Sequence, residues 1–188
     1  MPLVPIQPPD FDVDLDIRYA TANNVTGRPI YSRPVAYLHP EAAAHLDRAI
    51  TLARPLGLRL RIFDAFRPSE AQWRLWHAYP SAEFVADPRR GSPHSRGAAV
   101  DLTLVDGDGR TLEMGTDFDS FTPQAHHART DISVAAQRNR ALLLGLMTAA
   151  GWDNFMNEWW HYQLFNARQR LPVFSDSALA VSMMAPED

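Results

Sequence analysis

The sequence predicts an α+β fold, with a central, mainly antiparallel sheet flanked by helices. Segments of helical and of strand-like spacing are mixed without the regular alternation that gives a parallel sheet. One predicted strand is also followed by a hairpin signal, the DGDG of residues 106–109. A chain of 188 residues is long enough to bury its own core. We therefore expect one domain over 1–188, with a Pro-rich lead-in at 1–10 and a C-terminal tail at 166–188.

The first predicted helix begins at Pro40, and Pro55 with Gly57 ends it. Apolar residues recur at helical spacing between these limits, which favours a helix with one buried face. The segment LRLRIF, from Leu58 to Phe63, then alternates apolar and basic residues. This alternation predicts a half-buried strand.

A second helix is expected over EAQWRLWHAY, ending near Pro80, with Ser69 and Gln72 as a capping box. Residues 98–105 form the next predicted strand. After the DGDG turn, RTLEM at 110–114 is the expected returning strand.

The last third of the chain contains one long predicted helix, from Val134 to Ala150. Ser133 is the expected N-cap of this helix, and Gly151 follows its C-terminus. Residues 115–131 have little periodicity and are predicted to form a loop. WWHYQLF at 159–165 is rich in aromatic residues, which predicts a final strand.

Composition and charge exclude several kinds of protein. The net charge of −4 gives no electrostatic reason to expect nucleic acid or an anionic membrane as a partner. No cysteine is present, so any metal must be bound by His, Asp or Glu. The N-terminus lacks the pattern of a signal peptide, and no stretch approaches the roughly 20 apolar residues of a spanning helix. We expect a cytoplasmic protein.

The stretch SPHSRGAAVD contains the first candidate site residues, His94 and Asp101. Strand alternation directs Val100 and Leu102 into the core and Asp101 to the opposite, polar face, near the turn that contains His94. A histidine and an aspartate brought together in this way suit a divalent metal. Taken alone, the stretch is more typical of an ordinary turn that leads into a strand.

Two further segments offer reactive side chains. Glu158 and His161 share one site only if Glu158 lies in the turn before the strand, because residues three apart in a strand face opposite sides. The alternative is an exposed glutamate and a core histidine. In DAFRP, Arg67 follows a predicted strand and can reach a cleft, although an arginine paired with a surface aspartate is the more common arrangement.

Together the three segments supply what a hydrolytic metal site needs. His94, Asp101 and His161 are the predicted ligands, Glu158 the predicted base, and Arg67 the predicted stabiliser of negative charge. Three protein ligands leave a fourth position for water, as in catalytic rather than structural zinc sites.

This set of motifs resembles the D-alanyl-D-alanine dipeptidases of the VanX type. SPHSRGAAVD matches the pattern Ser-x-His-x-x-Gly-x-Ala-x-Asp, EWWH matches the Glu-x-x-His that follows it, and DAFRP lies upstream. ANNVTGRPIY, MGTDFD and AAQRNRALLL are also similar, so the resemblance extends from about Asp14 to about Leu164. The family implies a single, small α+β zinc peptidase domain that hydrolyses D-Ala-D-Ala, with one Zn²⁺ per chain.

The resemblance also implies residue roles. His94, Asp101 and His161 would bind zinc, Glu158 would be the base, and Arg67 would stabilise the transition state. Ser92 and Asp119 would hold the termini of the dipeptide, and the charge of Asp119 suits the ammonium end. Phe66 stands where the family commonly has tyrosine, a difference expected to affect the pocket without abolishing activity.

Two alternatives share these motifs. One is a related zinc D,D-carboxypeptidase or cell-wall peptidase that acts on longer peptides. The other is a non-catalytic zinc- or peptide-binding module of the same fold, which would have no need of Glu158. The sequence leaves open the oligomeric state, and whether the activity serves glycopeptide resistance or D-Ala recycling.

Overall fold

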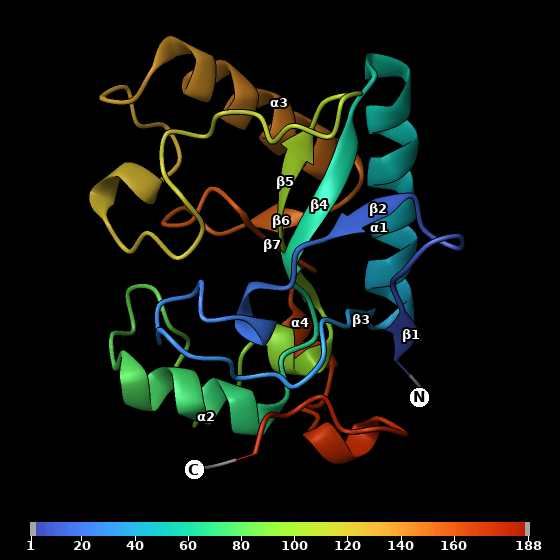
Figure 1. Cartoon of the computed structure of the whole chain (residues 1–188), viewed down its shortest axis with the longest axis vertical. Coiled ribbons are helices and arrows are strands. Elements are labelled where there is room, and N and C mark those ends of the chain that lie inside the picture. The colour runs from blue at the N-terminus through green and yellow to red at the C-terminus, as the bar shows by residue number, and fades with distance from the viewer. Residues whose placement is uncertain (1–2, 187–188) are drawn as a thin grey trace.

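A five-stranded sheet with the strand order β2-β4-β5-β7-β6 forms the centre of the molecule (Figure 1). The computed structural model describes residues 3–186. The strands are β2 (Val13–Leu15), β4 (Arg59–Asp64), β5 (Ala99–Val105), β6 (Asp153–Asn154) and β7 (His161–Gln163). Only β2 and β4 run parallel in this sheet; the other neighbours are antiparallel. The predicted α+β class with a mainly antiparallel sheet is confirmed.

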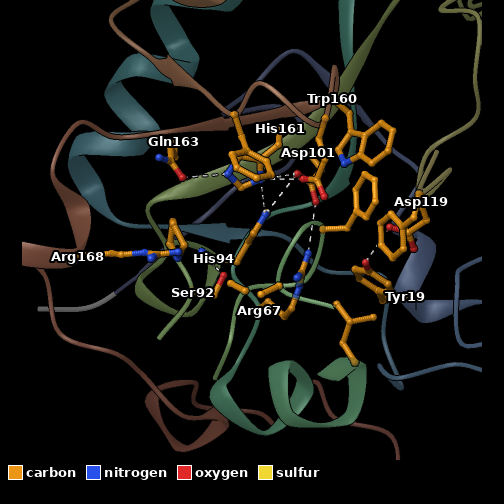
Figure 2. A pocket seen from close by; sticks show the side chains of 18 residues that line it. Tyr19, Arg67, Ser92, His94, Asp101, Asp119, Trp160, His161, Gln163 and Arg168 are labelled. Atoms are coloured by element: carbon orange, nitrogen blue, oxygen red, sulfur yellow. Dashed lines mark hydrogen bonds and ion pairs between the residues drawn. The ribbon is translucent and has the colours of Figure 1, made fainter. Parts of the chain in front are cut away.

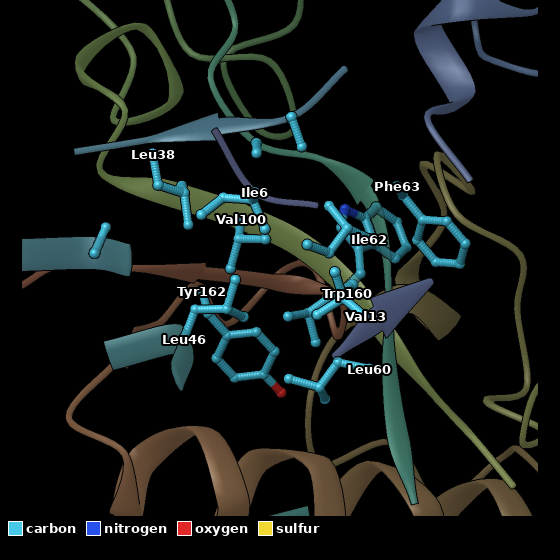
Figure 3. Close-up of a cluster of buried hydrophobic side chains, with 14 of the residues drawn as sticks. Ile6, Val13, Leu38, Leu46, Leu60, Ile62, Phe63, Val100, Trp160 and Tyr162 are labelled. Atoms are coloured by element: carbon cyan, nitrogen blue, oxygen red, sulfur yellow. The ribbon is translucent and has the colours of Figure 1, made fainter. Parts of the chain in front are cut away.

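Two long helices pack against the sheet and against each other: α1 (Pro40–Ala53) and α3 (Val134–Ala149). Their apolar residues meet those of the strands, as Leu46 meets the region of Val100 and Tyr162 in Figure 3. Ser133 is the N-cap of α3, as predicted, and its hydroxyl accepts a hydrogen bond from the Ala136 N–H. Both helices therefore lie close to their predicted bounds.

Helix α2 (Ser69–Ala78) forms as predicted, but its expected capping box is wrong. Ser69 is the first helical residue, its hydroxyl bonds Glu70, and the cap position is Pro68. The Gln72 side chain turns away from the helix terminus, because it bonds both Arg67 and the Ala86 carbonyl. Gln72 therefore makes tertiary hydrogen bonds in place of the helix-capping bond that its spacing from Ser69 predicted.

The predicted hairpin after β5 contains a turn but no second strand. Asp106 N–H donates to the Arg110 carbonyl, and a single bridge joins Val105 to Thr111 before the chain leaves the sheet. The final strand is likewise shorter than predicted, since residues 159–160 lie in a turn. Residues 115–131 form the expected loop, with one short 3₁₀ turn at Pro123–Ala125.

Several small elements were not predicted. β1 (Val4–Pro5) pairs with β3 (Tyr37–Leu38) in a separate two-stranded sheet, and α4 is Ala167–Arg170. The C-terminal residues beyond α4 lie against α2 at the end of the molecule opposite α3 (Figure 1), where Ser69 N–H donates to the Phe174 carbonyl. Within residues 3–186, no helix has the length and apolar character needed to cross a membrane.

Candidate active site

A cavity of about 260 Å³ opens where β5 and β7 lie side by side (Figure 2). It collects side chains from the strand ends, from the turn that precedes β5, and from loops distant in the sequence. All seven sequence-predicted site residues line it: Arg67, Ser92, His94, Asp101, Asp119, Glu158 and His161. Its wall also contains apolar side chains, among them Leu75, Phe84, Phe121, Phe155 and Trp160.

His94 is positioned by a tight turn that packs against the core. It begins a single 3₁₀ turn, His94–Arg96, and Gly97 then reverses the chain with a left-handed φ of 62°. His94 is buried, and its carbonyl accepts a hydrogen bond from the Arg67 N–H. The turn therefore fixes the imidazole in the cavity and ties it to the backbone of the arginine.

Asp101 and His161 are direct cross-strand partners, because β5 and β7 pair in the register Asp101↔His161. On the other side of Asp101, an irregularity between Ile62 and Asp64 in β4 sets Asp64 opposite it. The sequence placed Asp101 on a polar face, but β5 is buried along its entire length. Loops and the turn before β5 cover this second face and enclose the site.

Three atoms that can bind a cation converge on one point. His94 Nε2 lies 3.1 Å from His161 Nδ1, and Asp101 Oδ1 lies 3.3 Å from the first and 3.0 Å from the second. The remaining imidazole nitrogens face acceptors, since His94 Nδ1 lies 2.7 Å from the Ala65 carbonyl and His161 Nε2 lies 3.1 Å from Gln163 Oε1. The protons therefore belong on those outer nitrogens, and the lone pairs point inward.

These three donors fit a small divalent ion. Two imidazole nitrogens and a carboxylate form a common set of zinc ligands, and tetrahedral bonds of about 2.0–2.1 Å set the ligand atoms about 3.3 Å apart. The observed separations match this spacing, and all three side chains are buried. Burial also lowers the pKa of His161, which keeps this imidazole in the neutral form that a metal ligand needs.

Asp101 is held in its charged form. Burial raises the pKa of this carboxyl, but the neighbouring imidazoles of His94 and His161 outweigh burial and leave the pKa well below its ordinary value. Its second oxygen, Oδ2, lies 3.4 Å from Arg67 Nη2. The ionised aspartate thus connects the cluster of ligands to the arginine.

Arg67 is buried and held from several sides. Its Nε donates to Asp64 Oδ2 at 2.8 Å, and its Nη1 donates to Gln72 Oε1 at 3.1 Å. The guanidinium also lies 4.9 Å from the centre of the Tyr19 ring. The pairing of Arg67 with an aspartate, raised from the sequence as an alternative, does occur, but its partner Asp64 is 1% exposed, so the pair is part of the site and not of the surface.

Glu158 lies in the turn before β7, as a shared site with His161 requires. Its Oε2 is 3.9 Å from His161 Nδ1, and no donor within residues 3–186 bonds its carboxyl group. Burial, together with the charges of Asp101 and Asp119, raises the pKa of Glu158 well above its ordinary value. A carboxyl group with a raised pKa is suited to accept a proton and to return it during a hydrolytic reaction.

Asp119 and Ser92 lie on different sides of the three ligands (Figure 2). Asp119 accepts hydrogen bonds from the Tyr19 hydroxyl at 3.0 Å and the Val25 N–H at 3.2 Å, and burial raises its pKa to about 7. Ser92 Oγ accepts from the His94 N–H at 3.1 Å, which leaves its hydroxyl proton for a ligand. The two residues are therefore able to bind groups of opposite charge.

Sequence reasoning missed the residues that support these groups. Asp64 and Gln72 orient Arg67, Tyr19 bonds Asp119, and Gln163 orients His161. Gln163 stands two residues after His161 in a strand, so its placement on the same face was a signal available in the sequence. Phe66, expected to affect the pocket, lies in the hydrophobic core and does not line the cavity.

Comparison with known proteins gives one consistent family. The model of the peptidase family described as D-Ala-D-Ala dipeptidase matches residues 3–179. The D-alanyl-D-alanine dipeptidase of Escherichia coli is 42% identical over 88% of this chain and 85% of its own length. That of Enterococcus faecium is 34% identical over 79% of this chain and 84% of its own length.

A solved structure is similar at lower identity. A mutant of the vancomycin-resistance D,D-pentapeptidase VanY, in complex with Zn(II), is 17% identical to this chain and has a TM-score of 0.48. The alignment covers 90% of both chains.

Proposed function

The chain belongs to the D-Ala-D-Ala dipeptidase family of peptidases, and from this membership we propose that it is a zinc-dependent dipeptidase that hydrolyses D-alanyl-D-alanine to two D-alanines. The observation that carries the proposal is the convergence of His94 Nε2, Asp101 Oδ1 and His161 Nδ1 beside a buried glutamate and a buried arginine. A single Zn²⁺ on these three atoms would polarise the substrate carbonyl and acidify a water molecule, lowering its pKa from about 15.7 toward 7.

Glu158 is the proposed base and acid. Its carboxylate takes a proton from the attacking water and then delivers that proton to the leaving amine. The absence of hydrogen bonds to this group among the described residues supports the role, because both oxygens remain available to water and substrate. Burial and the neighbouring carboxylates of Asp101 and Asp119 raise its pKa, and a raised pKa helps the group to accept the proton of the water.

Arg67 is the proposed stabiliser of the developing oxyanion. Asp64, Gln72 and Asp101 occupy four of its five N–H donors, and one N–H of Nη1 remains. Because these contacts fix the guanidinium before substrate arrives, little reorganisation is needed as charge develops on the carbonyl oxygen.

The partner we propose is a small dipeptide, with Asp119 near its ammonium group and Ser92 near its carboxylate. Buried polar groups that bond both termini disfavour longer peptides, because an extended chain leaves them unpaired. A cytoplasmic location, and the absence of nucleic-acid or membrane partners, stay predictions from the sequence.

Hydrolysis of D-Ala-D-Ala by the purified protein tests the proposal. We expect release of D-alanine that stops on treatment with a chelator and returns with one equivalent of Zn²⁺. A pentapeptide ending in D-Ala-D-Ala should be cleaved far more slowly. Faster cleavage of the pentapeptide would assign the chain to the carboxypeptidase alternative, and zinc binding without hydrolysis of either would assign it to the non-catalytic one.

Glu158→Gln tests the role of the base. The variant keeps the shape of the side chain and should retain zinc, while turnover falls by about 10²–10⁴-fold. Elemental analysis and a D-alanine assay measure the two quantities on the same sample. Turnover close to that of the unaltered protein would remove Glu158 from the mechanism.

A further inference from the structure

Charged groups lie at both ends of the cavity, with the three ligand residues between them. In Figure 2, Asp119 and Tyr19 lie on one side of His94, Asp101 and His161, and Arg168 lies on the other, beyond Ser92. One end is therefore acidic and the other is basic. A zwitterionic dipeptide carries the complementary charges at its two termini.

Arg168 comes from the C-terminal part of the chain, for which the sequence indicated no role. It lies on α4, directly after the buried Ala167, and its side chain is exposed yet lines the cavity. Within residues 3–186 it makes no hydrogen bond or ion pair. Its guanidinium is thus free to bind a ligand.

The neighbouring arginine on the same helix is different. Arg170 donates to both carboxylate oxygens of Glu41, at 3.1 and 3.0 Å, and does not line the cavity. The pair is half-exposed and lies outside the site. Arg170 is therefore already paired with a carboxylate of the chain, whereas Arg168, on the same helix, is not so paired among the described residues.

A second arginine, Arg96, lies in the turn that carries His94, and burial and the charge of Arg168 both lower its pKa. Arg96 is itself committed to backbone carbonyls, those of Leu171 and Arg90. Arg168 is the one of the two that lines the cavity.

We propose that Arg168 binds the free C-terminal carboxylate of the substrate and thereby selects peptides that end one residue after the scissile bond. The inference rests on the proposed dipeptidase function. The substrate would lie with its ammonium group at Asp119, its peptide carbonyl at the ligand cluster, and its carboxylate between Ser92 Oγ and Arg168. A planar guanidinium bonds a carboxylate through two parallel N–H donors, which fixes orientation as well as charge.

Substitution of Arg168 separates carboxylate binding from other effects when two substrates are compared. For D-Ala-D-Ala, Arg168→Gln should lower kcat/KM about tenfold, mainly through KM, while Arg168→Lys retains part of the affinity. For D-Ala-D-Ala amide, which lacks the negative charge, Arg168→Gln should have no effect. Arg170→Gln, the matched control, should behave like the unaltered enzyme toward both substrates.

Ionic strength provides a second readout. Because Arg168 is exposed, salt should screen its attraction for a carboxylate, and the difference in KM between the unaltered enzyme and Arg168→Gln should shrink as NaCl increases. A purely structural role for Arg168 predicts no such change.

Equal losses for the acid and the amide, or no loss for either, would overturn the assignment of Arg168 while the dipeptidase function stands. Failure of the zinc-loaded, unaltered protein to hydrolyse D-Ala-D-Ala would overturn the proposed function, and this inference with it.

Discussion

Asp119 is a half-buried residue with a left-handed backbone. Its φ of 59° lies in a region that aspartate and asparagine adopt more readily than most residues other than glycine. The Tyr19 hydroxyl and the Val25 N–H bond its two oxygens. These contacts hold the acid at one end of the cavity, and burial raises its pKa to about 7.

This raised pKa predicts a pH-dependent contribution to stability. Between about pH 4 and pH 7 the folded chain keeps a proton on Asp119 that the unfolded chain has released. The contribution of this group is therefore favourable at low pH, and is lost as pH rises through that window, by up to about 1.4 kcal/mol per pH unit.

Asp119→Asn removes the titration and keeps the shape. The amide oxygen can accept from Val25 while its NH₂ donates to the Tyr19 oxygen, so both contacts survive. Urea unfolding of the metal-free proteins at pH 5 and pH 8 should show the variant gaining stability relative to the unaltered chain at the higher pH. A difference that is the same at both values would contradict the raised pKa.

The sequence indicated site residues where chemistry and spacing coincide, and missed those whose role depends on a contact across the fold. His94, Asp101, Glu158 and His161 occupy motifs, and the structure brings them together. Tyr19 lies 100 positions from Asp119, and nothing local indicates that they meet. The roles of the motif residues in catalysis stay predictions until they are tested.

At the scale of elements, the turn that carries His94 depends on Gly97. With φ at 62°, a Cβ on Gly97 would lie 2.8 Å from the backbone nitrogen of His39 and 2.7 Å from a methyl group of Leu3. The Gly97 carbonyl also accepts a hydrogen bond from that same His39 nitrogen. The turn is therefore pressed against the start of α1 at a distance that only glycine permits.

Gly97→Ala should destabilise the fold and weaken metal binding together. The left-handed conformation costs about 1–2 kcal/mol for alanine, and the steric contact adds about 1–3 kcal/mol. Gly57→Ala is the matched control, because Gly57 has a φ of 69° and a Cβ added there would meet no atom within 4 Å. Urea unfolding and zinc titration of both variants measure the difference, and equal losses would mean that close packing at Gly97 is unimportant.

Long helices were predictable because their patterns repeat over several turns, as in α1 and α3. Short strands were not. β2 and β6 contain three and two residues, too few for alternation to be recognised. The expected strand at 110–114 forms one bridge only, because a turn signal specifies a reversal and does not specify how far the returning chain stays paired.

At the scale of the whole molecule, the C-terminal segment is tied to the segments around the site. The Phe174 N–H donates to the Ser95 carbonyl at 2.7 Å, and the Phe174 carbonyl accepts from Ser69. Further on, Ser32 N–H donates to the Met183 carbonyl. Residues 171–186 thus connect the His94 turn, the start of α2 and the N-terminal third of the chain.

Removal of this segment should therefore loosen the site. A chain that ends at Arg170 keeps every cavity residue but loses both bonds of Phe174, so we expect a lower Tm and faster amide hydrogen exchange in residues 92–97. A chain that ends at Leu179 retains Phe174 and is the control. Equal exchange in the two truncated chains would show that the turn holds its shape without Phe174.

The sequence did not predict that residues 171–186 support the site, because this segment lacks periodicity and its contacts are mainly backbone hydrogen bonds. Backbone hydrogen bonds do not depend on the pattern of side chains from which the elements were predicted. Fold class, by contrast, followed from the mixture of long helices and strands, which is a property averaged over the chain.

The pairing of Asp101 with His161 links the ligand set to the completeness of the sheet. The two residues stand 60 positions apart along the chain and meet only when β7 has docked beside β5. Closing so long a loop costs entropy. A metal ion would find all three ligands together only once the last strand has reached its place, so its uptake would report that the sheet is complete.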